Sequence, residues 1–449
     1  MAEHDMRRVA VIGGKRIPFC RSYTSYGDLS NLQMMTTALK GVVDTYELQD
    51  THIDEVVGGA VVTHSKDWNL AREAAISAGL GLTSPGITMM QACGTSLQAA
   101  LGIGAKIATQ QIECGIATGA DTISDAPIVF GRSFAHRLAG LSRAKSIGQK
   151  LAVFKGFQPG ELAPQPPNTG EPRTGLSMGQ HCELMAQKWQ ISREDQDKLA
   201  FESHKKAAAA YESGFMDDLL EPCAGVFQDN NMRADISLDK MATLKPVFER
   251  SKRGTLTAAN STPFTDGASA VLLASDAWAK ERGLTPQAYL THSHTSALDF
   301  VAGEGLLMAP TIAVSKLLEK AGLELQDFDF YEIHEAFAAQ VLCTLKAWNT
   351  PEYCERVLGR NKALGEIDME KFNVVGSSLA YGHPFAATGG RILATLGKLL
   401  ERNGGGRGLI SICTAGGMGV AAILESANGA AGSNKSKSSA GGQANGKSN

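Results

Sequence analysis

The chain has 449 residues, of which 43 are Lys or Arg and 46 are Asp or Glu, so its formal net charge is −3. Its hydrophobic fraction of 43% is typical of a globular protein with enough apolar material for two or three domains. The near-neutral balance excludes the broad basic surface of a nucleic-acid-binding protein, so we expect no nucleic acid as a partner. No run approaches the roughly 20 consecutive apolar residues of a membrane-spanning helix.

Cysteine usage and the first residues both bear on the cellular compartment. The eight cysteines are scattered without CxxC pairs, which favours neither a zinc site nor a disulfide framework. The opening MAEHDMRRVAVIGG enters an apolar run directly and lacks the long apolar segment of a signal peptide. We therefore expect a cytoplasmic protein with no bound metal, in which most cysteines are buried small hydrophobes.

The first block of the chain alternates strand-like and helix-like segments. Short apolar runs bounded by turn residues predict strands, and longer stretches with helical apolar spacing predict helices. The predicted strands are VAVIGG (9–14), EVVGGAVV (55–62) and ECGIATGA (113–120), and the predicted helices are 29–46 and 95–110. This alternation is typical of an α/β fold.

A second block repeats this pattern. Its predicted strands are FDFYEIHEAF (328–337), NVVGSS (373–378) and GLISICTAGG (408–417). The last apolar runs of the two blocks, ASAVLLAS (268–275) and GVAAILES (419–426), align without a gap, and each follows a Gly-containing turn. The match indicates a duplicated α/β unit.

Between the blocks the sequence changes character. QPGELAPQPPNTGEP (158–172) must be irregular, whereas residues 191–214 read as a helix that Ser192 can cap and Gly214 can end. Residues 428–449 hold no aromatic or branched aliphatic side chain, so they cannot offset their ordering entropy by burial. The predicted organisation is an N-terminal half of residues 1–125 plus 246–277, an inserted loop domain of residues 126–245, a C-terminal half of residues 278–427 and a disordered tail of residues 428–449.

Four motifs place reactive side chains beside clustered glycines. The first is QACGTSLQAALGIGAKIA, which begins at Gln91 and holds Cys93 between an apolar run and a helix of small residues. Backbone N–H groups and the helix dipole at such a turn favour the thiolate, the nucleophilic form of Cys. The alternative interpretation is a buried, inert Cys.

The other three motifs lie in the second block. GHPFAATGG (382–390) holds His383 at a loop edge where a rigid ring can exchange a proton, although a structural His is the alternative. HEAF (334–337) has the wrong spacing for an HExxH zinc site. CTAGGMG (413–419) opens with a second Cys and a turn that can aim backbone N–H groups at an oxyanion. Its glycine order disfavours a dinucleotide-binding loop.

These motifs, in this order, resemble the thiolase family over residues 8–426. Thiolases carry a nucleophilic Cys in the first half and NEAF or HEAF, GHPxxxxG and CxxGGxG in the second. TAANSTPFTDGASAVLL (257–273) also resembles the strand-turn-strand that closes their first half. The resemblance implies two similar halves in a five-layered α-β-α-β-α arrangement, with the insertion over the active site, and a homodimer or a dimer of dimers.

The resemblance also implies an activity: CoA-dependent cleavage of a 3-ketoacyl-CoA into acetyl-CoA and a shortened acyl-CoA. Cys93 would take the acyl chain, and His383 would accept its proton. Cys413 would protonate the enolate of the leaving acetyl-CoA and then activate the incoming CoA thiol. His334 and His383 would bind the thioester oxygen, and the backbone N–H groups of Cys93 and Ala415 would form a second oxyanion hole. Coenzyme A is a substrate here, and no bound cofactor is expected.

Two positions depart from the usual thiolase pattern. Ala415 stands where CxGGG thiolases have Gly, and its N–H remains a donor if its φ is not positive. His334 replaces an Asn that most thiolases use to hold a water, and a His can donate directly to the thioester oxygen. HEAF with GHPFAATG resembles the branch of thiolases that serve as β-subunits of trifunctional fatty-acid oxidation complexes. That branch partners an α-subunit with hydratase and 3-hydroxyacyl-CoA dehydrogenase activities.

The family resemblance also assigns a substrate-binding set. Ser177 and Met178 match a segment that lines the pantetheine channel, and Thr262 matches a position close to the thioester. Met418, inside the CTAGGMG motif, completes the expected substrate and CoA contacts.

Residues 127–160 form an unusual basic segment. They contain six Lys or Arg and no acidic residue, interleaved with apolar side chains. A solvated charged face is the simplest interpretation. The functional hypothesis is an amphipathic basic surface that meets CoA phosphates, a partner subunit or an anionic membrane.

Three other functions remain as alternatives. A biosynthetic acetoacetyl-CoA thiolase runs the same chemistry in the condensing direction, and the catalytic residues cannot separate the two because the reaction is reversible. A decarboxylating ketoacyl synthase is disfavoured by Cys413, since decarboxylation generates the carbanion without a second thiol. A non-enzymatic scaffold is disfavoured because every side chain that the mechanism needs is present.

Overall fold

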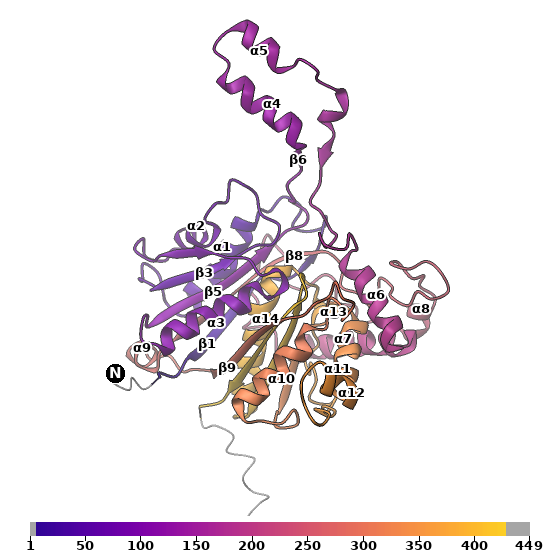
Figure 1. Ribbon diagram of the computed structural model, residues 1–449. Coiled ribbons are helices and arrows are strands. Elements are labelled where there is room, and N and C mark those ends of the chain that lie inside the picture. Colours follow the sequence, from indigo (N-terminus) through magenta and orange to yellow (C-terminus); the bar gives the residue numbers. More distant parts are fainter. Residues whose placement is uncertain (1–5, 428–449) are drawn as a thin grey trace, which may run out of the picture.

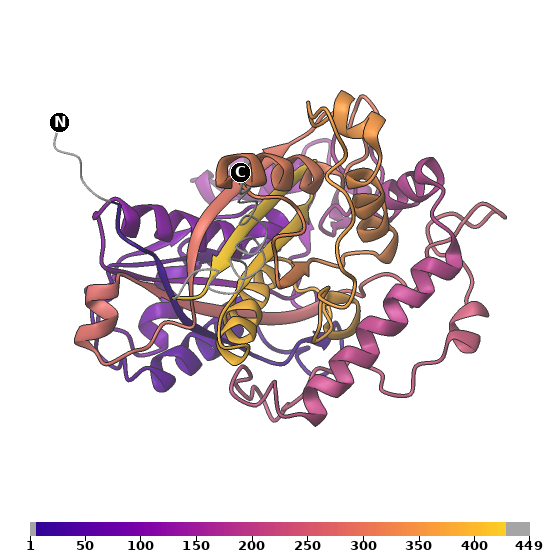
Figure 2. The ribbon, with the colours of Figure 1, turned by 90° about the horizontal axis from the view of Figure 1, so that it is seen from below.

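A computed structural model describes residues 6–427 of the chain (Figures 1 and 2). The predicted disordered tail, residues 428–449, lies outside the described residues. Strands of the first half are β1 (Ala10–Arg16), β2 (Cys20–Arg21), β3 (Glu55–Gly59), β4 (Gly86–Thr88), β5 (Cys114–Asp121) and β8 (Thr265–Ala274). Strands of the second half are β9 (Ala288–Ala297), β10 (Phe330–Ile333), β11 (Arg407–Thr414) and β12 (Met418–Glu425).

The two halves repeat one strand pattern, which confirms the predicted duplication. In the first half β3 is parallel to β5, which pairs antiparallel with β8, and β8 pairs antiparallel with β1. In the second half β10, β11, β12 and β9 follow the same sequence of orientations. A short β1–β9 contact at Ala10 and Tyr289 joins the halves. The aligned runs 268–275 and 419–426 therefore lie in equivalent strands.

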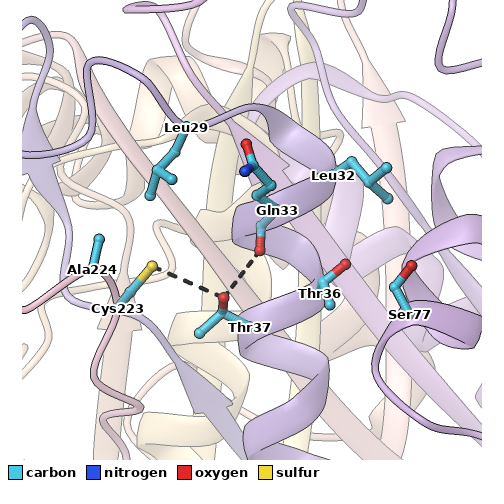
Figure 3. A pocket seen from close by; sticks show the side chains of 8 residues that line it. All are labelled: Leu29, Leu32, Gln33, Thr36, Thr37, Ser77, Cys223 and Ala224. Atoms are coloured by element: carbon cyan, nitrogen blue, oxygen red, sulfur yellow. Dashed lines mark hydrogen bonds between the residues drawn. The ribbon is translucent and has the colours of Figure 1, made fainter.

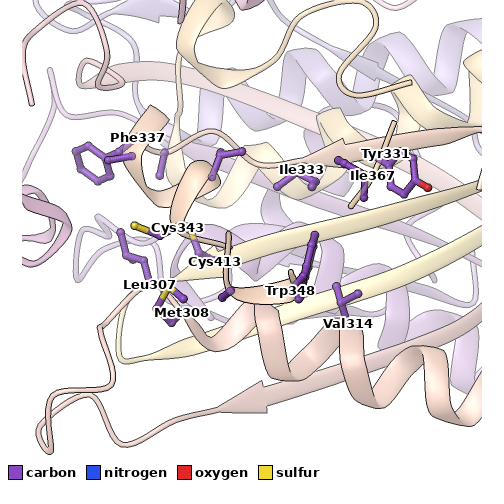
Figure 4. Packing of buried hydrophobic residues seen from close by; sticks show 14 of the residues in the cluster. Leu307, Met308, Val314, Tyr331, Ile333, Phe337, Cys343, Trp348, Ile367 and Cys413 are labelled. Carbon is purple, nitrogen blue, oxygen red and sulfur yellow. The ribbon is translucent and has the colours of Figure 1, made fainter. Parts of the chain in front are cut away.

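Helices cover both faces of each half-sheet. The helices that form the layers are α1 (Asn31–Thr45), α2 (Leu70–Ser77), α3 (Thr95–Ala108), α10 (Ala309–Ala321), α11 (Ala338–Trp348) and α14 (Thr388–Arg402). Three buried apolar clusters fill the spaces between them. One lies between α1, α2 and the first half-sheet, a second surrounds α3 and α14 between the half-sheets, and a third packs α10 and α11 on the second half-sheet (Figure 4). This is the predicted five-layered α/β arrangement.

Most predicted elements are confirmed with small shifts in their ends, but one strand is wrong. NVVGSS (373–378) is a turn that leads into α13 (Ser378–Tyr381). Asn373 adopts a positive φ of 41°, and its side chain bonds both the N–H and the C=O of Ile333 at 2.9 Å. A side chain thus takes the hydrogen bonds that a neighbouring strand would have made to the end of β10.

The strand predicted over 328–337 is also shorter than expected. β10 ends at Ile333, and the HEAF segment then turns towards residues 260–262, where Thr262 donates its N–H to the Ala336 carbonyl at 3.1 Å. This turn takes the side chains of the motif out of the strand register.

The region between the blocks divides into two parts. Its elements are β6 (Val129–Phe130), α4 (Arg132–Arg143), α5 (Ile147–Val153), β7 (Pro164–Gln165), α6 (Met178–Trp189), α7 (Arg193–Glu212) and α8 (Leu238–Ala242). Residues 127–165, which we call the arm, project away from the body of the molecule, and neither α4 nor α5 buries a residue (Figure 1). α6 and α7 instead pack on α11 and α13, and Ser192 caps α7 as predicted.

The insertion therefore has two parts, the arm and the part that holds α6, α7 and α8, and its place over the active site stays a prediction. The domain boundaries stay a prediction.

The remaining helices are α9 (Asp276–Glu281) and α12 (Pro351–Arg356), with 3₁₀ turns at Ala92–Gly94, Pro159–Leu162 and Phe385–Ala387. Among residues 6–427, no helix combines the length and apolar character needed to cross a membrane.

Candidate active site

Cys93 lies in a strained turn at the start of α3. Ala92, directly before it, has a positive φ of 46°, which is costly for a residue with a side chain. The 3₁₀ turn Ala92–Gly94 then leads into the helix. All eight cysteines are within the described residues, and seven are buried, whereas Cys93 is partly exposed. The turn thus holds Cys93 at the edge of the core.

His383 lies at the corresponding junction of the second half, two residues before the 3₁₀ turn Phe385–Ala387, which leads into α14. The starts of α3 and α14 approach closely, because a Cβ at Gly389 would lie only 2.4 Å from the backbone N of Leu97. Ser96 joins the two turns, since its hydroxyl accepts the N–H of Gly390 at 2.7 Å. The two helix starts therefore bring the first and second motifs together.

The Cys93 and His383 side chains form a nucleophile–base pair. His383 Nε2 lies 3.1 Å from Cys93 Sγ, within the range expected for proton transfer. The other ring nitrogen, Nδ1, lies 2.6 Å from the hydroxyl of Thr388, and the backbone N–H of His383 donates to the Thr265 hydroxyl at 2.7 Å. Thr388 thus orients the imidazole, and Thr265 fixes the backbone that carries it.

Burial keeps this pair neutral. It raises the pKa of the Cys93 thiol to about 12, against the opposing hydrogen bonds from backbone N–H groups. It also lowers the pKa of His383 to about 3, with a smaller contribution from Arg391 in the same direction. Backbone N–H groups do favour the thiolate, as expected, but desolvation outweighs them. A neutral imidazole is available as a base for a neutral thiol.

This neutral pair predicts the pH dependence of alkylation at Cys93. A thiol with a raised pKa gains thiolate about tenfold per pH unit, so the iodoacetamide rate should rise about tenfold per unit from pH 6 to 9. Peptide mass analysis after timed labelling measures that rate. A plateau across the same range would instead show a resting thiolate–imidazolium pair.

Two backbone donors converge on the reacting sulfur. The N–H groups of Cys93 and Ala415 both hydrogen-bond the Cys93 thiol, and both oppose the rise of its pKa. Among the described residues with positive φ are Gly416 at 79° and Gly417 at 69°, but not Ala415. Ala415 therefore keeps the conformation that its donor role requires. The Gly416 N–H is bonded at 2.6 Å to Oε1 of Glu171, which fixes the turn.

Cys413 lies at the end of β11 opposite Gly419, within the third apolar cluster (Figure 4). Burial raises its thiol pKa well above the usual value, and the nearby Cys93 raises it further. The close approach of the Cys93 motif and the Cys413 motif depends on Gly94, where a Cβ would lie 3.0 Å from Thr414 Cγ2. Cys413 is thus a protonated thiol beside Cys93.

His334 follows β10 and lies beside His383, with ring centroids 4.2 Å apart. The next residue, Glu335, is buried and accepts bonds from Ser203 at 2.7 Å and Asn373 at 2.7 Å. The carboxylate thus anchors the segment that carries His334, a role that the motif alone did not reveal.

The ligand atoms of Cys93, His334 and His383 all lie within 4.8 Å of one another. A thiolate and two imidazoles can bind zinc, but the short thiol–imidazole contact also suits proton transfer. The absence of a metal stays a prediction.

The four predicted CoA contacts lie in different places. Thr262 bonds the HEAF segment at Ala336, and Met418 begins β12 directly after the Gly-rich turn. Ser177 accepts the N–H of Gln180 as the cap of α6, and Met178 packs on the third apolar cluster. Their contacts with CoA stay a prediction.

Two buried carboxylates near the site were missed from the sequence. Glu171 ties the segment before α6 to the turn after Cys413. Asp121, at the end of β5, accepts the N–H groups of Val62 and Ala386, both at 2.8 Å, and so fixes the turn after His383. Its burial raises its pKa to about 7. The only signal in the sequence for this role of Asp121 is its position directly after a predicted strand.

A separate surface pocket of about 410 Å³ lies beside α1 (Figure 3). Its lining residues are Leu29, Leu32, Gln33, Thr36, Thr37, Ser77, Cys223 and Ala224. None of them belongs to the four motifs, so this pocket is not the candidate active site.

Comparisons with known proteins agree with this geometry. The thiolase N-terminal domain family matches residues 9–277, and the thiolase C-terminal domain family matches residues 284–426. The chain therefore belongs to the thiolase family.

Similar proteins are named more narrowly. A 3-ketoacyl-CoA thiolase of Shewanella woodyi is 43% identical over 424 residues, and one of Shewanella baltica is 42% identical, each match covering 93% of this chain and 97% of the relative. Among solved structures, human mitochondrial 3-ketoacyl-CoA thiolase is 28% identical with a TM-score of 0.77, covering 94% of this chain and all of that one. An acetyl-CoA acetyltransferase of Bacillus anthracis is 30% identical, also with a TM-score of 0.77, and covers 94% of this chain and 99% of that one.

Proposed function

We propose that this protein is a 3-ketoacyl-CoA thiolase, which cleaves 3-ketoacyl-CoA with CoA to give acetyl-CoA and a shortened acyl-CoA. The observation that carries the proposal is the neutral Cys93–His383 pair at 3.1 Å, beside a second protonated thiol at Cys413. The names of the relatives in Shewanella support the same substrate class.

The first half of the reaction forms an acyl-enzyme. His383 Nε2 takes the proton of Cys93 as the sulfur attacks the keto carbon, and the oxyanion that forms there meets the N–H groups of Cys93 and Ala415. The bond between C2 and C3 then breaks. Its electron pair passes to the thioester as an enolate, whose oxygen lies against His334 and His383, and Cys413 protonates C2 to release acetyl-CoA.

The second half returns the enzyme to its resting state. Cys413, now a thiolate, takes the proton of an incoming CoA thiol, and the CoA sulfur attacks the acyl group on Cys93. The Cys93 sulfur leaves as a thiolate and recovers its proton from His383. Because both thiols and both imidazoles are neutral at rest, every charge in the cycle is transient and is stabilised in a buried, low-dielectric site.

The chain length of the substrate tests the degradative function. We expect thiolysis of both acetoacetyl-CoA and 3-ketohexadecanoyl-CoA, measured as acetyl-CoA release, which fits the last step of fatty-acid β-oxidation. Activity on acetoacetyl-CoA alone would instead favour an acetyl-CoA C-acetyltransferase that works in the condensing direction, as the name of the Bacillus anthracis neighbour suggests.

The assembly that we propose is a homodimer, alone or paired into a dimer of dimers. β4 ends the path of the sheet, and Ile87 and Met90 near it are exposed. An exposed apolar edge strand is a ready pairing surface, and this one leads directly to the Cys93 turn. Sedimentation of the purified chain should give twice or four times the mass of 47.4 kDa; a monomer would refute this assembly.

The proposed partners extend to an α-subunit with hydratase and 3-hydroxyacyl-CoA dehydrogenase activities, because HEAF and GHPFAATG resemble the thiolases of such complexes. Mild purification from the host should recover this subunit with the chain.

The cytoplasm is the proposed location, since eight unpaired cysteines fit a reducing compartment.

The arm fits an anionic membrane surface best among its three hypothetical contacts. Its apolar side chains Ile128, Ile147 and Leu151 are all exposed. Ile128 precedes β6, and the other two lie on α5, which like α4 buries no residue. Basic residues interleaved with exposed apolar ones are typical of peripheral membrane binding. The arm also projects away from the body of the molecule (Figure 1), which disfavours a role in holding CoA phosphates.

Charge reversal in the arm tests this contact. Changing Arg143, Lys145 and Lys150 to Glu should weaken binding to vesicles that contain anionic lipid by at least about 100-fold, because each basic side chain near such a surface contributes about 1 kcal/mol. The KM for CoA substrates should not change. A changed KM would favour the CoA contact, lost complex assembly would favour a partner subunit, and no change in any of the three would show a solvated face.

A further inference from the structure

His334 has one ring nitrogen bonded and one nitrogen free. Its Nδ1 lies 2.9 Å from the hydroxyl of Ser378. Its Nε2 is buried and has no hydrogen-bond partner among the described residues, and one nitrogen of the ring lies within 4.8 Å of the ligand atoms of Cys93 and His383. The side chain is fully buried, and burial, His383 and Arg391 all lower its pKa well below the usual value. A neutral imidazole carries one proton, so the question is which nitrogen holds it.

The contacts of Ser378 answer this question. Arg391 donates a guanidinium N–H to the Ser378 hydroxyl oxygen at 2.7 Å, and a guanidinium can only donate. The hydroxyl keeps one proton of its own, and its other contact is His334 Nδ1. If Nδ1 also donated, this buried O–H would have no acceptor, which costs about 1–3 kcal/mol. Ser378 therefore donates to Nδ1, and the proton of His334 lies on Nε2.

His383 holds the opposite arrangement. Its Nε2 faces Cys93 Sγ at 3.1 Å and must be free to accept the thiol proton, so its own proton lies on Nδ1, where the Thr388 hydroxyl accepts it at 2.6 Å. Two neighbouring imidazoles thus have opposite tautomers, one suited to take a proton and the other to donate a hydrogen bond.

Arg391 is a buried cation that no step of the mechanism uses. Its side chain is 1% exposed, it also donates to Ser377 at 3.1 Å, and Glu332 lies 3.9 Å away. The contacts run in one direction, from Arg391 to Ser378 and from Ser378 to His334. Hydrogen bonds aligned in this way polarise one another, so the positive charge strengthens the Nε2–H of His334 as a donor.

We propose that Ser378 and Arg391 are positioning residues that fix the proton of His334 on Nε2, so that His334 donates a hydrogen bond to the enolate oxygen when the C2–C3 bond breaks. The hydrogen bond from His334 to the enolate oxygen rests on the proposed function, but the assignment of the His334 tautomer does not. His334 then assists only carbon–carbon cleavage. Transfer of an acyl group between CoA and Cys93 uses the N–H groups of Cys93 and Ala415 instead.

The test compares two reactions in Ser378→Ala. Thiolysis of acetoacetyl-CoA requires cleavage of the carbon–carbon bond, whereas exchange of labelled CoA into acetyl-CoA requires only acyl transfer to Cys93. We expect the kcat of thiolysis to fall about 10- to 100-fold, the loss typical when a hydrogen-bond partner that orients a metal-ligating His is removed, with KM and the exchange rate within about twofold of wild type. Ser378→Thr, which keeps the hydroxyl, should restore thiolysis. Equal losses in both reactions of Ser378→Ala would overturn the proposal.

A tautomer measurement separates this proposal from a structural role. In protein labelled with ¹⁵N-histidine, NMR should show His334 protonated on Nε2, with His334→Asn used to assign the signal. Ser378→Ala should give a mixture of tautomers, and Ser377→Ala is the matched control because it removes a hydroxyl that contacts Arg391 but not His334. A proton on Nδ1 in the wild type would overturn the proposal even if Ser378→Ala did not fold. Absence of wild-type thiolysis would refute the proposed function and leave the tautomer result standing.

Discussion

Replacing Cys93 by Ser should reduce thiolysis by about 10⁴-fold or more, the scale seen when a catalytic nucleophile is removed. A hydroxyl is far harder to ionise than a thiol, and the pKa of about 3 at His383 makes that imidazole a weak base. The exchange of sulfur for oxygen at a partly exposed turn should leave the fold intact. Steady-state thiolysis and the mass of the enzyme after incubation with substrate measure the effect, and the acyl adduct should disappear with the activity.

Cys223→Ser is the matched control for this variant. Cys223 lies beside the surface pocket of α1, where its sulfur contacts the Thr37 hydroxyl at 3.9 Å (Figure 3), and it is remote from the four motifs. This variant should keep both activity and the acyl adduct. Full activity in Cys93→Ser would contradict the nucleophile assignment.

Cys413→Ala should lower the kcat of thiolysis by about 10²- to 10⁴-fold, the usual contribution of a general acid or base. Without this thiol the enolate of acetyl-CoA has no adjacent acid, and the incoming CoA thiol has no base. Burial keeps the Cys413 proton in place at neutral pH, so the loss should be the same across pH 6 to 9. Stopped-flow measurement of acetyl-CoA release gives the rate.

Cys343→Ala separates this effect from a loss of packing. Cys343 is fully buried in the same apolar cluster as Cys413 (Figure 4), so both variants remove a sulfur from one core. Only Cys413→Ala should lose turnover. Similar losses in both variants would indicate that the cluster, not the Cys413 thiol, is responsible.

The sequence predicts the reacting side chains better than it predicts the residues that orient them. Cys93 and His383 lie in turns that lead into helices, and Cys413 lies near the end of β11 just before a Gly-rich turn. These features are visible in the local sequence. Ser378 and Arg391 carry no such signal, because their contacts depend on how α13 and α14 pack against β10. Their alignment with His334 is a property of tertiary packing, which residue patterns along the chain do not encode.

The duplicated strands were predictable because their apolar residues form continuous local runs. A strand such as β8 buries all of its residues, so its apolar run shows in the sequence. NVVGSS has the same apolar character, but Asn373 uses its side chain to pair with Ile333, a contact that only the folded arrangement reveals. The effect of burial on the pKa of Cys93 was missed because the residues of a turn do not show how deeply the fold buries it. The sequence likewise does not show that the arm projects from the body of the molecule, because this depends on how the rest of the chain packs.

The correspondence of the two junctions has a consequence for what either half could do alone. Each half supplies a 3₁₀ turn at the start of a helix, but Cys93 lies within the first turn, whereas His383 lies two residues before the second. Cys93 and His383 occupy different positions relative to the two helix starts, so the two copies differ at this junction and the present pair needs both of them. Neither half expressed alone holds both a nucleophile and its base.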